Sequence, residues 1–244
     1  MLLVSRDCNY LYKSLWVCLI SLLFLIIFLL SSSRFSINIL FRVKISHCQW
    51  TVQFAGFEAP NFRRLADKIA EAGFLVVAPD FFYGDPLDIH NPNIDRAAWM
   101  KAHNAEKGCE DAMAVIDALK SEGVSAIGAA GFCWGGMAVV KLAKFDRIRA
   151  AVILHPGPIT VEEINEVKVP TALLGAEVDH LCPAEHLQYL GEILSAKPEV
   201  DSFTKIYPGV KHGWTLMYNV DDEAAVKIAE EAHSDMLNWI TKYM

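Results

Sequence analysis

The chain has 244 residues, of which 53% are hydrophobic, and its formal net charge at pH 7 is −7. This length is sufficient for one sizeable α/β domain with its own hydrophobic core. The acidic balance and the lack of a basic cluster in the sequence argue against a nucleic acid as the partner.

The first 48 residues are more apolar than the rest of the chain. Leu15–Leu30 is an apolar run interrupted only by Ser21, with Lys13 before it and Arg34 soon after. A membrane-spanning helix needs about 20 apolar residues, with a lower limit near 17, so the run is marginal as a span. It is consistent with a signal anchor, with a cleaved signal peptide that lacks an A-x-A-like cleavage site, and with an incorrectly joined coding segment.

We therefore divide the chain into an apolar N-terminal segment, residues 1–48, and a globular domain, residues 49–244. A native segment predicts an N-terminal apolar helix and a membrane-associated protein, whereas a misjoined one predicts a cytoplasmic protein. The six cysteines are scattered, without a CxxC pair or metal-ligand spacing. We expect reduced thiols, no disulfide framework and no metal site.

The globular part alternates between strand and helix patterns. A predicted strand at 49–55 is followed by helical spacing of apolar residues over 59–73, and then by the continuous apolar run 74–80, which is typical of a buried parallel strand. An amphipathic stretch covers 96–121, and further strands and helices follow. This alternation predicts an α/β fold with a mainly parallel sheet and helices on both faces. Such sheets bind ligands at the carboxyl ends of their strands.

Cys133 stands at one of these strand ends. The sequence GFCWG, residues 131–135, lies between a short predicted strand and a helical pattern, and it fits the G-x-nucleophile-x-G elbow with cysteine as the nucleophile. The turn places the thiol at a helix N-terminus, which favours the thiolate. The backbone N–H of Trp134 then points toward an oxyanion formed on an attacked carbonyl. The alternative is that Cys133 is only a small residue in a tight corner.

A nucleophilic thiol needs a base, and the base needs an acid that orients it. His212 follows the last predicted strand, and Asp179 directly follows another, with Glu177 as the competing carboxylate. The order Cys133, Asp179, His212 is the nucleophile–acid–base order of α/β-hydrolases. His155 also follows a strand, but it comes too early in the chain for the base of this order.

Four separated motifs together resemble the dienelactone hydrolase family, particularly its plant members: AGFLVVAPDFFYGD (72–85), GFCWGG (131–136), LLGAEVDHLCP (173–183) and YPGVKHGW (207–214). The resemblance extends from about Gly56 to the C-terminus. It implies an α/β-hydrolase fold, a triad of Cys133, Asp179 and His212, and hydrolysis of a small-molecule ester or lactone through a thioester acyl-enzyme. It implies no metal or organic cofactor. The N–H groups of Trp134 and Phe54 fall on the oxyanion-hole positions.

The chain departs from the family pattern in three places. Gln53 stands where members have a carboxylate that partners the resting thiol, and we expect it to be one of the substrate-binding residues. The neighbourhoods of the family's substrate-binding arginines contain none here, and the aromatic residues Phe82, Tyr83 and Trp214 suggest an apolar acyl or alcohol pocket, unless they belong to the core. The family also has about two strands before the one at 49–54, so we expect the sheet to lack its first strands.

The sequence thus predicts a carboxylic ester or lactone hydrolase. The alternative is a catalytically weak or inactive α/β-hydrolase-like protein that binds a small molecule. Gln53 and the atypical N-terminal segment, residues 1–48, favour this alternative. Membrane association would depend on Leu15–Leu30. The pattern gives no indication of the oligomeric state.

Overall fold

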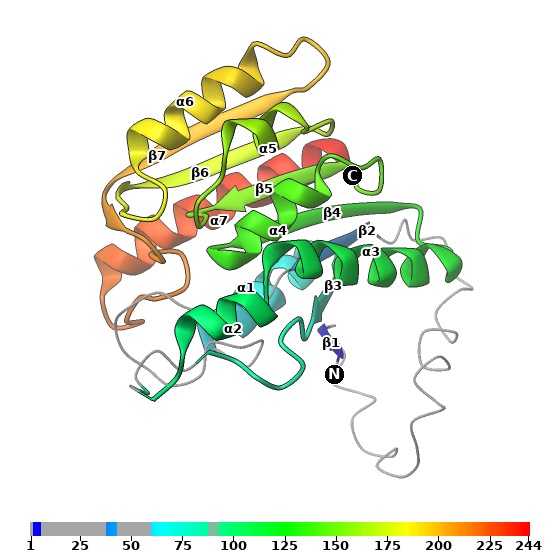
Figure 1. The fold of residues 1–244 in the computed structure, drawn as a ribbon, viewed down its shortest axis with the longest axis horizontal. Helices are drawn as coiled ribbons and strands as arrows, with labels where there is room; N and C mark the ends of the chain where they lie inside the picture. Colours follow the sequence, from blue (N-terminus) through cyan, green and yellow to red (C-terminus); the bar gives the residue numbers. More distant parts are fainter. Residues whose placement is uncertain (1, 6–37, 43–59, 88–90, 92) are drawn as a thin grey trace.

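The computed structural model describes residues 2–5, 38–42, 60–87, 91 and 93–244. The described strands form one sheet in the order β1-β3-β2-β4-β5-β6-β7 (Figure 1). Neighbouring strands are parallel, except that β1 runs antiparallel to β3. The strands are β1 (Leu2–Ser5), β2 (Asn38–Arg42), β3 (Phe74–Pro79), β4 (Ala126–Phe132), β5 (Ala150–Leu154), β6 (Thr171–Val178) and β7 (Ser202–Lys211).

Helices cover both faces of the sheet (Figure 1). The buried side chains of α2 to α6 pack in one core and those of α1 and α7 in another. Successive positions of β4 alternate between the two, with Ile127 and Ala129 in the first core and Ala130 and Phe132 in the second. The helices are α1 (Pro60–Glu71), α2 (Arg96–Ala102), α3 (Ala105–Ser121), α4 (Trp134–Leu142), α5 (Val161–Asn165), α6 (Ala184–Ser195) and α7 (Glu223–Tyr243).

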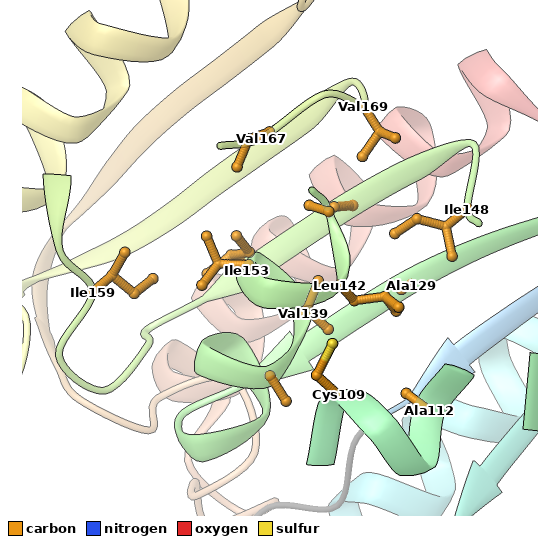
Figure 2. Close-up of a cluster of buried hydrophobic side chains, with 14 of the residues drawn as sticks. Cys109, Ala112, Ala129, Val139, Leu142, Ile148, Ile153, Ile159, Val167 and Val169 are labelled. Atoms are coloured by element: carbon orange, nitrogen blue, oxygen red, sulfur yellow. The ribbon is translucent and has the colours of Figure 1, made fainter. Parts of the chain in front are cut away.

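The first core joins α3 and α4 to the centre of the sheet. Figure 2 shows Cys109 of α3 close to Val139 and Leu142 of α4. Ala112 of α3 and Ile153 of β5 belong to the same cluster. Each fully buried aliphatic side chain stabilises the fold by roughly 1.5–3 kcal/mol. This packing holds α4, the helix that begins at the candidate site, against β4 and β5.

The structure confirms the predicted alternation of strands and helices. Helix α1 ends two residues before Gly73, which has a φ of +94°, and β3 follows at once. The amphipathic stretch at 96–121 is divided into two helices. Asn104 causes this division, because its side chain accepts a hydrogen bond of 2.8 Å from the N–H of Lys107 and so starts α3.

Strands β1 and β2 both lie within residues 1–48, where the sequence predicted an apolar segment in place of the first strands. The sheet therefore includes two short strands from this part of the chain. The apolar run Leu15–Leu30 and the predicted strand at 49–55 lie outside the described residues. Within the described ranges, none of the helices has the length and apolar character needed to cross a bilayer.

Candidate active site

Cys133 occupies a sharp turn between β4 and α4. Its φ of +53° and ψ of −117° lie in a region that residues other than glycine rarely adopt. Three hydrogen bonds hold it there: its N–H donates to the carbonyl of Leu154 (3.1 Å), and its carbonyl accepts from Gly136 (2.9 Å) and Gly157 (3.1 Å). Backbone strain of this kind persists only where the surroundings enforce it, and it occurs most often at functional sites.

The residues around the turn leave no room for side chains. A Cβ built on Gly136 would lie 2.9 Å from the Cβ of Pro156, which follows β5. The glycine thus lets α4 begin directly against the end of the neighbouring strand. The N–H of Trp134 belongs to the first residue of this helix, so it lies at the positive end of the helix dipole.

Asp179 and His212 form a buried pair at the ends of β6 and β7. Nδ1 of His212 lies 2.7 Å from Oδ2 of Asp179. The other carboxylate oxygen, Oδ1, accepts hydrogen bonds from the N–H groups of Leu181 (2.9 Å) and Cys182 (3.3 Å). The carboxylate is therefore fixed from two sides, and it fixes the orientation of the imidazole ring. An ionised carboxylate against Nδ1 favours the tautomer whose Nε2 can accept a proton.

The competing carboxylate, Glu177, makes a different contact. It is exposed, and its Oε2 accepts a hydrogen bond of 2.6 Å from the N–H of Gly209 in β7. The structure thus brings Asp179, and not Glu177, to His212.

The chemically interesting residues follow four neighbouring strands. Cys133 follows β4, His155 follows β5, Asp179 follows β6 and His212 follows β7, and these strands are adjacent and parallel in the sheet (Figure 1). The carboxyl ends of parallel strands lie at one edge of the sheet, where ligands of α/β folds bind. An elbow thiol, a histidine and an orienting carboxylate at this edge are the groups that acyl transfer by a cysteine nucleophile requires.

The early position of His155 in the chain argues against it as the catalytic base. In the structure it is 1% exposed, and its ring centroid lies 5.1 Å from that of His212. Burial, followed by the neighbouring His212 and His233, holds the pKa of His155 well below its ordinary value. Its place directly after a strand in LHPG was the one signal in the sequence that pointed to it.

The aromatic residues expected around the substrate lie in three different settings. Phe82 is fully buried, and its ring packs against those of Trp99 and Trp134 at centroid distances of 5.0 and 4.8 Å. Tyr83 is 67% exposed, and its hydroxyl lies 2.7 Å from Asp111 on α3. Trp214 is buried, and its ring centroid lies 5.1 Å from that of His155.

The side chain of Trp134 belongs to the core rather than to an open surface. Its indole N–H donates to the carbonyl of His103 at 2.7 Å, so only its backbone N–H remains as a candidate oxyanion donor. The other expected donor, Phe54, and Gln53 both lie outside the described residues.

The two other described cysteines are buried thiols with raised pKa values. Burial raises the pKa of Cys109 to about 11, and burial together with the charge of Asp179 raises the pKa of Cys182 to about 12. In the part of the chain that the structure describes, no group of three His, Cys, Asp or Glu side chains could hold a metal ion.

Comparisons with known proteins show the family and the fold of the chain. Residues 51–244 match the model of the dienelactone hydrolase family. The chain is 33% identical over 193 residues to a carboxymethylenebutenolidase homolog from Xenopus tropicalis, and the match covers 78% of each chain. It is 38% identical over 145 residues to an endo-1,3;1,4-beta-D-glucanase from Zea mays, which covers 59% of this chain and 46% of the maize protein. The chain thus spans less than half the length of that maize relative.

Among solved structures, one assigned as a dienelactone hydrolase from Klebsiella pneumoniae superimposes with a TM-score of 0.64. The two sequences are 20% identical, and the match covers 84% of this chain and 87% of the other. At this identity the likeness concerns the fold alone.

Proposed function

The chain belongs to the dienelactone hydrolase family and is a hydrolase of that type, and from this premise we propose that it cleaves carboxylic esters or lactones with Cys133 as the nucleophile. The observation that carries the proposal is the hydrogen bond of 2.7 Å between His212 and Asp179 at the edge of the sheet where the strained elbow places Cys133. The substrate is a small molecule with a reactive carbonyl.

The reaction begins with proton transfer from the Cys133 thiol to His212. The thiolate attacks the carbonyl carbon, and the negative charge passes to the carbonyl oxygen. The N–H of Trp134 stabilises this oxyanion, with Phe54 as the second donor that the family resemblance implies. The intermediate then expels the alkoxide, which takes the proton from His212 and leaves a thioester on Cys133. With a lactone, the released hydroxyl remains part of the same acyl group.

Water completes the cycle. His212 removes a proton from a water molecule that attacks the thioester carbon, and the sulfur leaves as thiolate and recovers the proton from His212. The products are the acid and the free enzyme. In both half-reactions Asp179 stabilises the imidazolium form of His212 without taking the proton itself.

A direct assay tests the proposal. Steady-state hydrolysis of a 4-nitrophenyl ester by the full chain is compared with that by Cys133→Ala, with Cys109→Ala as the matched cysteine control. We expect Cys133→Ala to reduce kcat by at least roughly a thousandfold, and Cys109→Ala to keep the wild-type rate. Mass spectrometry after rapid acid quench should detect the acyl group on the peptide that contains Cys133.

Equal background rates in the wild type and Cys133→Ala would contradict the proposal. Saturable, stoichiometric binding of the ester without turnover would then support the alternative of a small-molecule binding protein.

Cleavage of a glucan, the activity in the maize relative's name, is a poorer fit to the described residues. Most glycosidases use two carboxylates that flank the scissile bond. At the end of β6, the carboxylate of Asp179 is hydrogen-bonded to His212, and that of Glu177 to the backbone of Gly209. We expect no release of reducing sugar from a mixed-linkage β-glucan under conditions in which the ester is hydrolysed.

A further inference from the structure

His155 occupies the strand end between the nucleophile and the acid. It directly follows β5, which lies between β4, the strand before Cys133, and β6, the strand before Asp179. Its φ is +33°, an unusual value for a residue with a Cβ, and its N–H donates to the carbonyl of Leu174 in β6 at 2.8 Å. The backbone is thus held in a strained conformation that turns the side chain into the interior.

The ring of His155 packs against both sides of the candidate site. Its centroid lies 5.1 Å from that of His212 with an interplanar angle of 63°, and 5.1 Å from that of Trp214 with an angle of 64°. On the nucleophile side, it lies 6.0 Å from Phe132, the residue before Cys133. The two edge-to-face contacts restrict the orientations of the His212 and Trp214 rings relative to that of His155.

A buried hydrogen bond joins His155 to the loop that carries the base. Its Nε2 lies 2.7 Å from Oγ1 of Thr215, which is 0% exposed and stands three residues after His212. The carbonyl of the same threonine accepts a hydrogen bond of 2.8 Å from Nε2 of His233 in α7. The loop after β7 is therefore held by one histidine from the end of β5 and another from α7. Loss of either bond would leave a buried polar group unsatisfied.

His155 does not compete with His212 for the catalytic proton. Burial lowers the pKa of His155, and the proximity of His212 and of His233 lowers it further. The carboxylate of Asp179 is hydrogen-bonded to His212. A neutral ring at this point supports the neighbouring base without adding a second positive charge when that base is protonated.

We propose that His155 is a positioning residue, which acts through Thr215 and through direct ring contact to hold His212 in the orientation that the reaction with Cys133 requires. This inference rests on the proposed function. It differs from a purely structural role, because it predicts an effect on proton transfer rather than on folding alone.

The test uses variants of Thr215 that preserve its shape. Thr215→Val removes the hydroxyl group and keeps the volume, and Thr215→Ser keeps the hydroxyl group. For hydrolysis of a 4-nitrophenyl ester, we expect Thr215→Val to lower kcat about tenfold with KM within about twofold of the wild type, and Thr215→Ser to recover most of the loss. His155→Leu should have a similar effect, and the double variant should be no worse than the poorer single one. If His155→Leu fails to fold, the Thr215 pair decides the question.

A second measurement does not depend on turnover. The rate of Cys133 alkylation by iodoacetamide is measured against pH in the wild type, His212→Ala and Thr215→Val. We expect the wild type to react at pH 6 faster than His212→Ala, and Thr215→Val to fall between them. This pattern without any ester hydrolysis would support the positioning role and contradict the proposed function.

Two results would overturn the inference. The first is a Thr215→Val variant with lowered thermal stability but with wild-type kcat and a wild-type alkylation profile, which would show a packing role only. The second is wild-type alkylation that does not depend on His212, because there would then be no base whose position matters.

Discussion

The backbone of Gly131 lies directly against the carbonyl of Gly135, so that a Cβ built on Gly131 would be 2.1 Å from that oxygen. Backbone atoms cannot move aside as a flexible side chain can, and the elbow therefore requires glycine here. We expect Gly131→Ala to lower the free energy of unfolding by about 3 kcal/mol and to abolish ester hydrolysis.

Urea unfolding checks this prediction, with Gly123→Asn as its control. Gly123 has a φ of +87°, but a Cβ there meets nothing within 4 Å. The control should cost only about 1 kcal/mol, since strain in the backbone is its only penalty. A Gly131→Ala protein as stable as the control would show that the turn can relax.

The described cysteines should differ strongly in reactivity. Burial raises the pKa of Cys109 to about 11, and burial with the charge of Asp179 raises that of Cys182 to about 12, so both thiols are almost entirely protonated at pH 7. Cys133 lies at a helix N-terminus, which favours the thiolate. Iodoacetamide should modify Cys133 at least about a hundredfold faster than Cys109 or Cys182 in the folded protein, as measured by peptide mass spectrometry. In 8 M urea the three rates should converge, and similar rates in the folded state would argue against an activated thiol.

Replacement of Asp179 by asparagine separates its structural role from its electrostatic one. An amide oxygen can still accept the hydrogen bonds from Leu181 and Cys182, so we expect the loop to keep its conformation. The negative charge beside Nδ1 of His212 is lost, and kcat for the ester should fall by roughly a thousandfold or more. Glu177→Gln, two residues earlier, should retain the wild-type kcat, because Glu177 contacts Gly209. A lowered kcat in Glu177→Gln, with a wild-type kcat in Asp179→Asn, would assign the role of the orienting acid to Glu177.

Lys141 joins three helices through two ion pairs. It lies on α4, its Nζ is 2.7 Å from Glu106 of α3, and it also contacts Glu163 of α5. Burial alone would lower the pKa of Lys141, but its hydrogen bonds to the two glutamates outweigh this effect and raise it. The hydrogen bond from Lys141 lowers the pKa of Glu106.

These two pKa shifts predict how the contribution of Lys141 to the free energy of unfolding depends on pH. The lowered pKa of Glu106 gives stability that is present above pH 4.5 and is lost as the pH falls through the folded pKa. The raised pKa of Lys141 gives stability that is complete below pH 10.5 and is lost as the pH rises through the folded value. We expect Lys141→Met to cost about 1 kcal/mol at pH 7 and less at pH 3, as measured by urea unfolding. The exposed Lys144, 3.3 Å from Glu166, is the control, and Lys144→Met should have almost no effect at either pH.

The sequence was sufficient to predict the α/β architecture, because long apolar runs alternate with amphipathic stretches. It also predicted that Cys133, Asp179 and His212 follow strands, and the parallel sheet brings these strand ends to one edge. Such predictions succeed because strand ends in parallel sheets share a direction, whatever the details of packing.

The sequence did not predict the directions in which the side chains of loop residues point. Phe82 and Tyr83 are neighbours in one loop, yet the first is 0% exposed and the second 67%, since loops have no fixed alternation. The contact between His155 and Thr215, 60 residues apart, depends on the neighbouring strands and on a positive φ that no local pattern reveals. The strands β1 and β2 were also missed, because they are short and flank a much more apolar run.

The order of the strand ends along the chain has a consequence for synthesis on the ribosome. The elbow emerges first, whereas His212 follows about 80 residues later and pairs with Asp179 only after β7 has joined the edge of the sheet. At roughly 5–20 residues per second, this leaves an interval of several seconds. During that interval the proposed nucleophile lacks its proposed base. Under the mechanism proposed above, the thiol of Cys133 is therefore activated only after β7 and the residues that follow it have folded.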